Sequence, residues 1–107
     1  MECRLEGSTT DVEVPMFDAA VGDRVRLALR AGDILIAVEP PRGLSARNAL
    51  QGTISSLQDR GSSVAAIVDV GALLEVHLTL GATRDLKLVA GARVWLVIKT
   101  HSFHRIN

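Results

Sequence analysis

Three side chains suited to binding a small oxyanion stand together at residues 44–48, which read LSARN. Ser45 supplies a hydroxyl, Arg47 a guanidinium fork, and Asn48 an amide that can bond a ligand or fix a turn. A tetrahedral dianion needs several converging donors and one or two cations. The stretch therefore suggests an anion site, although Ser and Asn are also ordinary turn residues and a single Arg is usually solvated.

A second group of donors lies towards the end of the chain. Lys99 and Thr100 offer an ammonium and a hydroxyl where an apolar strand ends. Thr79 precedes an expected helical turn, whose first amides would point at an anion. No acidic residue occurs within 44–51 or 98–107. Because a structural ion pair needs a carboxylate and an anion pocket excludes one, we expect a pocket free of carboxylates.

Charge and composition narrow the classes of function. The chain has 107 residues, enough for one domain or two very small ones that share a core, and 48% of them are hydrophobic. Twelve basic side chains balance twelve acidic ones, so no global field attracts nucleic acid or an acidic membrane. Residues 1–44 carry 5 basic and 8 acidic side chains, whereas residues 45–107 carry 7 and 4. The charge that attracts anions therefore lies in the second part.

The chain is expected to be cytoplasmic. Its single cysteine, Cys3, excludes an internal disulfide and lacks an evident base partner, so we expect an inert thiol. No apolar core of a signal peptide follows Glu2 and Arg4. The longest apolar runs, at 34–38 and 94–98, are far shorter than the roughly 20 residues of a membrane span. Direct insertion into a membrane is therefore not expected.

Period-two alternation of apolar and polar side chains predicts many short strands. The alternating segments are 24–30, 50–57, 64–70 and 74–80. The runs at 34–38 and 94–98 do not alternate and are expected to be buried on both faces. Gly and Asp clusters such as AGD (31–33) and DRGSS (59–63) indicate turns between them. This spacing is typical of a β-barrel or sandwich. One short helix is expected at 82–88, capped by Thr79 or Thr83, and a loop at 16–23.

A weak internal repeat relates the two parts of the chain. Residues 21–34 align with 90–103, and Arg30 then falls opposite Lys99. The shared pattern of Gly, Val and Leu is also common in unrelated strands, so coincidence remains an alternative. The prolines of EPPRG (39–43) mark a junction. The first part, of about 40 residues, is too short to close a barrel and must borrow strands from its neighbour or from another chain.

Residues 44 to about 106 resemble the Mop, or TOBE, family of molybdate-binding domains. The resemblance rests on S-x-R-N at 45–48, D-V-G at 69–71, L-T at 78–79, L-x-L-x-x-G-x-x-V at 86–94 and I-K-[ST] at 98–100. The segment before S-x-R-N resembles the equivalent one in the ATPase subunit of bacterial molybdate ABC transporters. The resemblance implies an all-β chain, with an OB-type five-stranded Greek-key barrel at 44–107, a smaller related β-subdomain at 1–40, and one short helix.

The same resemblance implies where and what the domain binds. Molybdate or tungstate would lie where two protomers of a homodimer meet, and no cofactor is implied. The implied contact residues are Ser45, Ala46, Arg47, Asn48, Thr79, Lys99 and Thr100. The chain departs from the family pattern at Ala82, where relatives often have Ser or Gln, and Thr83 is a candidate substitute.

The implied function is that of a regulatory domain that senses the oxyanion imported by an ABC transporter. Its partners would be the ATPase domain of the same parent protein, peripheral on the inner face of the cell membrane, and indirectly the permease. The alternative is a structural TOBE module that pairs ATPase subunits or receives a regulatory protein without binding an anion. The chain contains no G-x-x-x-x-G-K-[ST] phosphate loop, so we do not expect it to hydrolyse ATP by itself.

Two further classes receive less support. Single-stranded nucleic acid binding uses aromatic platforms in a basic groove, but the only aromatic side chains are Phe17, Trp95 and Phe103. His101 and His104 would lie on opposite faces of a strand, and neither Cys nor a carboxylate completes a metal site around them. We expect Trp95 to pack in the core.

Overall fold

A computed structural model describes residues 1–106; Asn107, the last residue of the predicted barrel, lies outside the described residues. The strands are β1 (Glu2–Arg4), β2 (Asp11–Glu13), β3 (Leu27–Leu29), β4 (Leu35–Ala37), β5 (Asn48–Asp59), β6 (Ser63–Asp69), β7 (Leu73–Thr79), β8 (Arg93–Ile98) and β9 (Phe103–Arg105). The helix α1 (Leu80–Asp85) is accompanied by two 3-10 turns, η1 (Ala31–Asp33) and η2 (Thr100–Ser102). The expected all-β class is confirmed.

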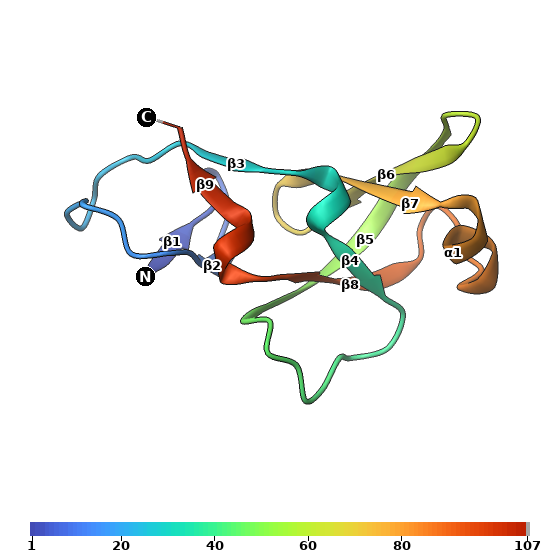
Figure 1. The fold of residues 1–107 in the computed structure, drawn as a ribbon, viewed down its shortest axis with the longest axis horizontal. Coiled ribbons are helices and arrows are strands. Elements are labelled where there is room, and N and C mark those ends of the chain that lie inside the picture. The colour runs from blue at the N-terminus through green and yellow to red at the C-terminus, as the bar shows by residue number, and fades with distance from the viewer. Residues whose placement is uncertain (107) are drawn as a thin grey trace.

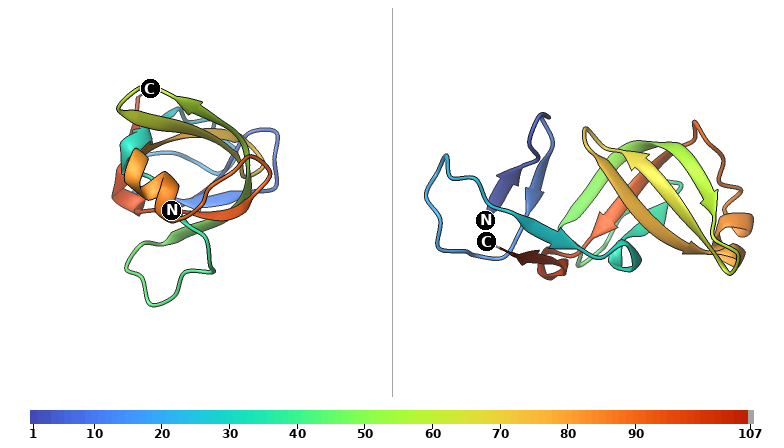
Figure 2. Two further views of the ribbon diagram at one scale, coloured as in Figure 1. Left: turned by 90° about the vertical axis from the view of Figure 1, so that its right-hand side faces the viewer. Right: turned by 90° about the horizontal axis from the view of Figure 1, so that it is seen from above.

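Five antiparallel strands form the main sheet, in the order β4-β8-β5-β6-β7. The sheet curls on itself, as the end-on view in Figure 2 shows, and η1 packs against β7 where the two edges approach. A bulge between Ile54 and Ser56 interrupts the pairing of β5 with β6 and supports the bend. The expected barrel is therefore present.

The barrel strands follow the sequence pattern from which they were predicted. In β7, Val76 is fully buried while Glu75 and His77 on either side are exposed. The run in β8 is buried as expected: Val94, Leu96 and Ile98 are each 0% exposed. Trp95 is half-buried, in keeping with a role in packing.

Three predicted elements differ from the structure in extent or environment. The run at 34–38 was expected to be buried on both faces, which is wrong: β4 lies at an edge of the sheet, and Leu35 is 64% exposed. The strand predicted at 24–30 shrinks to β3, which lies outside the main sheet. The helix starts earlier than predicted, because Thr79 caps it and accepts a hydrogen bond from the N–H of Ala82.

The aligned repeat corresponds to a repeated order of elements. The turns η1 and η2 occupy aligned residues, and Arg30 and Lys99 precede them in the same extended conformation. Each repeat then pairs with the other, because β3 pairs with β9 while β4 pairs with β8. In Figure 1, β9 lies close to β3 and β4 lies close to β8. The first part of the chain therefore borrows its strand partners from the second part within the same chain.

The hairpin of β1 and β2 sits beside the barrel at the opposite end from α1 (Figures 1 and 2). Val12 and Val14 are 2% and 1% exposed and belong to the same core cluster as Leu96 and Ile98. The hydroxyl of Thr10 donates a hydrogen bond to the carbonyl of Val70 at 2.5 Å, which ties the hairpin to a barrel turn. The division into a subdomain at 1–40 and a barrel at 44–107 stays a prediction. Strands of the first range pair with strands of the second.

Candidate functional site

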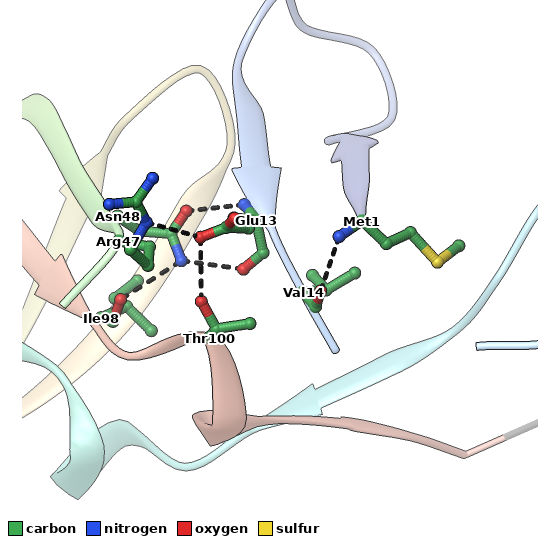
Figure 3. A network of polar contacts seen from close by, with 7 residues as sticks. All are labelled: Met1, Glu13, Val14, Arg47, Asn48, Ile98 and Thr100. Atoms are coloured by element: carbon green, nitrogen blue, oxygen red, sulfur yellow. Dashed lines mark hydrogen bonds and ion pairs between the residues drawn. The ribbon is translucent and has the colours of Figure 1, made fainter. Parts of the chain in front are cut away.

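A cleft of about 550 Å³ opens where the hairpin meets the end of the barrel. Its lining residues come from the hairpin, from the start of β5 and from the end of β8; they are Met1, Glu13, Val14, Pro15, Met16, Ser45, Arg47, Lys99, Thr100 and His101. We call this space the hairpin cleft. It gathers side chains of both donor groups identified in the sequence, and Figure 3 shows its polar contacts from close by.

Strand pairing explains why the two donor groups meet. Asn48, the first residue of β5, pairs with Ile98, the last residue of β8. Because these strands are antiparallel, the residue before Asn48 and the residue after Ile98 leave the sheet side by side. Arg47 and Lys99 are therefore brought to the same end of the barrel. Ser45, Arg47, Lys99 and Thr100 all line the hairpin cleft.

Asn48 holds the hairpin in place. Its side chain is 4% exposed. The amide oxygen accepts a hydrogen bond from the N–H of Glu13 at 2.7 Å, and the amide nitrogen donates to the carbonyls of Glu13 at 2.9 Å and Ile98 at 3.2 Å. The structure therefore shows the Asn48 amide positioning the backbone, which is one of the two roles expected from the sequence.

A carboxylate occupies the hairpin cleft. Oε2 of Glu13 accepts a hydrogen bond from Nε of Arg47 at 3.1 Å and another from the hydroxyl of Thr100 at 3.2 Å (Figure 3). The expectation of a pocket free of carboxylates is therefore wrong. The physical reason is that folding brings β2 next to the start of β5, so an acidic residue distant in sequence becomes a neighbour in space.

The charges of the hairpin cleft still favour an anion. Arg47 and Lys99 carry two positive charges against the single carboxylate of Glu13. Within residues 1–106, the ammonium of Lys99 has no ion pair with a carboxylate. The Arg47 side chain is 71% exposed, so it can turn towards a ligand at little cost in buried contacts.

A second hollow of about 420 Å³ shares Ser45, Lys99 and His101 with the hairpin cleft. It is lined by Asp33, Leu35, Leu44, Ser45, Ala46, Val97, Lys99, His101, Ser102 and His104. Ala46 lies here and not in the hairpin cleft. Because Ser45, Lys99 and His101 border both hollows, all the predicted residues except Thr79 belong to one region of the surface or to its support.

Within one protomer, Thr79 lies far from this region of the surface, at the other end of the barrel strands. It pairs with Ser63, towards the end of β5 marked by Asp59, whereas Asn48 begins that strand. Its hydroxyl oxygen accepts a hydrogen bond from Ala82 at 3.0 Å and is committed to the cap of α1. One chain alone therefore does not bring Thr79 to the other predicted residues.

Sequence reasoning missed the hairpin's contribution. Glu13, Met1 and Met16 reach the hairpin cleft from the first seventeen residues, and His101 reaches both hollows from η2. The one usable signal was the alternation in Val12-Glu13-Val14, which marks a strand with Glu13 on its polar face. That pattern predicts the strand but not the neighbour that Glu13 meets.

Neither a metal cluster nor a membrane helix accompanies the site in the described part of the chain. Among residues 1–106, no group of three His, Cys, Asp or Glu side chains is placed to share a metal ion. No helix in that range has the length and apolar character that spanning a membrane requires.

Comparison with known proteins connects this geometry to relatives. The TOBE domain family model matches residues 44–104. The molybdenum import ATP-binding protein ModC of Mesorhizobium japonicum is 37% identical over 105 residues, which are 96% of this chain and 28% of that protein. ModC of Photorhabdus laumondii is 33% identical over 93 residues, 86% of this chain and 26% of that protein. The chain thus spans about a quarter of the length of these relatives.

A solved structure shares the fold. The crystal structure of the cytoplasmic molybdate-binding protein ModG with molybdate bound superimposes with a TM-score of 0.67. The alignment covers 74% of this chain and 58% of that one, at 24% sequence identity. The likeness confirms that the barrel is of the same OB type.

Proposed function

The chain belongs to the TOBE domain family, and from that premise we propose that it binds a molybdate-type oxyanion, molybdate or tungstate, in the hairpin cleft. The observation that carries this proposal is the convergence of Ser45, Arg47, Lys99 and Thr100 on one cleft from two strand ends. Together they offer hydroxyl, guanidinium and ammonium donors, the set that a tetrahedral dianion requires.

We also propose that a second copy of the chain completes the binding site. A cleft of about 550 Å³ is far larger than one tetrahedral oxyanion needs, since a water molecule takes about 30 Å³ of liquid. Thr79, which is remote in its own chain, would reach the site only from a partner. We therefore place the anion between two protomers of a homodimer, with donors from both. Selectivity against sulfate would then rest on the size of the enclosed space, because charge and shape are alike.

The wider setting is a proposal about the protein from which such a domain comes. The ModC relatives are much longer than this chain, since the aligned residues make up 28% and 26% of their lengths, and their names describe ATP-binding proteins for molybdenum import. We place the domain beside an ABC ATPase on the cytoplasmic face of the membrane, in contact with the permease only through that ATPase. There it would sense the imported anion. Binding would shift the ATPases only to the extent that the anion favours one dimer arrangement over another.

The alternative that the family leaves open is a structural module. The exposed apolar side chains of Leu35 and Leu44 border the second hollow and would suit a protein partner without any anion. In that case Arg47 and Thr100 would serve only to hold Glu13.

Isothermal titration calorimetry of the 107-residue chain with molybdate, tungstate and sulfate separates these two functions. We expect binding of molybdate and tungstate that weakens at least about tenfold in Arg47→Ala and in Lys99→Ala, because each removes a charge-assisted donor. Arg24→Ala is the matched control: the Arg24 side chain is 90% exposed, pairs with Glu6 and lies outside the hairpin cleft. Calorimetric melts of each variant check folding. An absence of heat and of thermal shift at millimolar anion would leave the structural role.

A further inference from the structure

We propose that Glu13 is a built-in competitor for the anion, which fills part of the binding site while the site is empty. The inference rests on the proposed function and adds a residue that neither the sequence motifs nor the family pattern placed in the site. A bound oxyanion would then have to displace the carboxylate from its two donors. Glu13 would thereby set the anion concentration at which the site fills.

The contacts of Glu13 carry the proposal. A single oxygen, Oε2, accepts both from Nε of Arg47 and from the hydroxyl of Thr100. These donors come from different strand ends and converge on one point, as they would on one oxygen of a tetrahedral anion. A carboxylate oxygen and an oxyanion oxygen both bear negative charge and accept the same donors, so they cannot occupy that point together.

The backbone fixes where the carboxylate can reach. Val12 and Val14 are buried in the core on either side of Glu13, so a slip of the strand by one residue would expose them. Asn48 holds both the N–H and the carbonyl of Glu13. The main chain of Glu13 therefore stays in place while its side chain, 36% exposed, is free to turn into solvent. Displacement requires a change of rotamer and no movement of the hairpin.

The charges near Arg47 both favour and oppose the replacement of the Glu13 carboxylate by a bound anion. The empty site pairs Arg47 with one negative charge, and the filled site would hold two on the anion. Binding must first break the Glu13 contacts and then tolerate a carboxylate that remains nearby. Removing this charge without changing the shape of the side chain should strengthen binding.

The opposite role for Glu13 leads to an opposite result. A carboxylate inside an anion site can accept a hydrogen bond from an anion that carries a proton, such as hydrogen phosphate. Glu13 would then be a ligand contact, and its removal would weaken binding of phosphate. We favour competition because Oε2 already has two donors, which are the donors that the anion itself would use.

The test is calorimetry of the 107-residue chain with molybdate, tungstate and inorganic phosphate on the wild type and Glu13→Gln. Gln keeps the shape of the side chain, and the Asn48 contacts involve only the backbone. We expect Glu13→Gln to bind molybdate about tenfold more tightly, as the loss of a like charge and of a partly exposed ion pair allows. Glu6→Gln is the matched control, because it removes the same charge from the hairpin at a side chain that is 82% exposed and faces Arg24. Its molybdate affinity should stay within about twofold of the wild type.

The outcomes separate the two proposals. If the wild type binds molybdate and Glu13→Gln binds it equally or more weakly, competition is overturned while the proposed function stands. If Glu13→Gln loses phosphate binding that the wild type shows, Glu13 is a ligand contact and competition is likewise overturned. If neither protein binds any anion, although both melt cooperatively, both proposals fail. Tighter binding by Glu13→Gln that disappears on adding Arg47→Ala supports both.

Discussion

The side-chain amide of Asn48 pairs with the backbone of Glu13 in both directions, as a neighbouring strand would. It accepts from the N–H at 2.7 Å and donates to the carbonyl at 2.9 Å. A third hydrogen bond, to the carbonyl of Ile98, ties the same amide to the end of β8. One buried side chain thus continues the sheet into the hairpin and fixes the residue that faces Arg47.

Replacing Asn48 with Ala should destabilise the chain by about 2–4 kcal/mol, because three backbone groups lose their partner in a buried position. Asn48→Asp should be at least as damaging, since a carboxylate cannot donate to the two carbonyls and would be buried. Urea denaturation followed by fluorescence of Trp95 measures both. Gln51→Ala, an exposed amide on the same strand, is the control and should change little. Equal stability of Asn48→Ala and Gln51→Ala would contradict the clamp.

Gly52 should tolerate no side chain. A Cβ placed there would lie 2.6 Å from the carbonyl oxygen of Asp69 and 2.6 Å from Cγ1 of Val70. We expect Gly52→Ala to cost about 1–3 kcal/mol or more, because the backbone of β6 has to move. Gly32→Ala provides the comparison, since a Cβ at that residue would meet nothing within 4 Å. Thermal melts of the two variants should differ clearly, and coinciding melting temperatures would disprove the close approach.

Thr79→Ala should lower stability by about 1 kcal/mol through the loss of the helix cap. Thr79→Ser retains the hydroxyl oxygen that accepts from Ala82 and should restore most of that stability. Amide hydrogen exchange at Ala82 reports the cap directly and should be faster only in Thr79→Ala. If exchange is unaffected, the hydroxyl does not cap α1.

The pair of Arg4 and Asp11 should make a small part of the stability depend on pH. The hydrogen bond from Arg4 holds the pKa of Asp11 below its ordinary value of 3.8; desolvation opposes this shift, and the positive charge of Arg4 adds to it. A lowered folded-state pKa contributes stability above 3.8 that is lost as pH falls through the lower folded value. Asp11→Asn and Arg4→Gln should each flatten the acid limb of the stability curve by the same amount, measured by urea denaturation at several pH values. The double variant should show no further change.

Local pattern was sufficient to predict most of the barrel. Strands β5 to β8 alternate or run apolar over several residues, and their turns carry Gly or Asp, so short-range sequence determines them. Pattern failed for β4 because an apolar run such as LIAV does not reveal whether both of its faces are covered. Strand β4 lies at an edge of the sheet, and its Leu35 is 64% exposed at the border of the second hollow.

The candidate site was likewise predictable from the sequence only in part. Arg47 and Lys99 could be placed together because each adjoins the end of a recognisable strand, and antiparallel pairing joins those ends. Glu13 could not be placed, since its contact with Arg47 depends on how the hairpin docks on the barrel. That docking is decided by Asn48 and by buried Val12 and Val14, which act across elements and not along the sequence.

The exchange of strands between the two repeats has a consequence for biosynthesis. Strand β3 has β9 as its partner, and the whole barrel lies between them in the sequence. Because translation proceeds from the N-terminus, the backbone groups of β3 must remain hydrated, or be sheltered by a chaperone, until residues 103–105 have emerged from the ribosome. The early part of this polypeptide therefore reaches its final state only after the strands of the barrel have been synthesised.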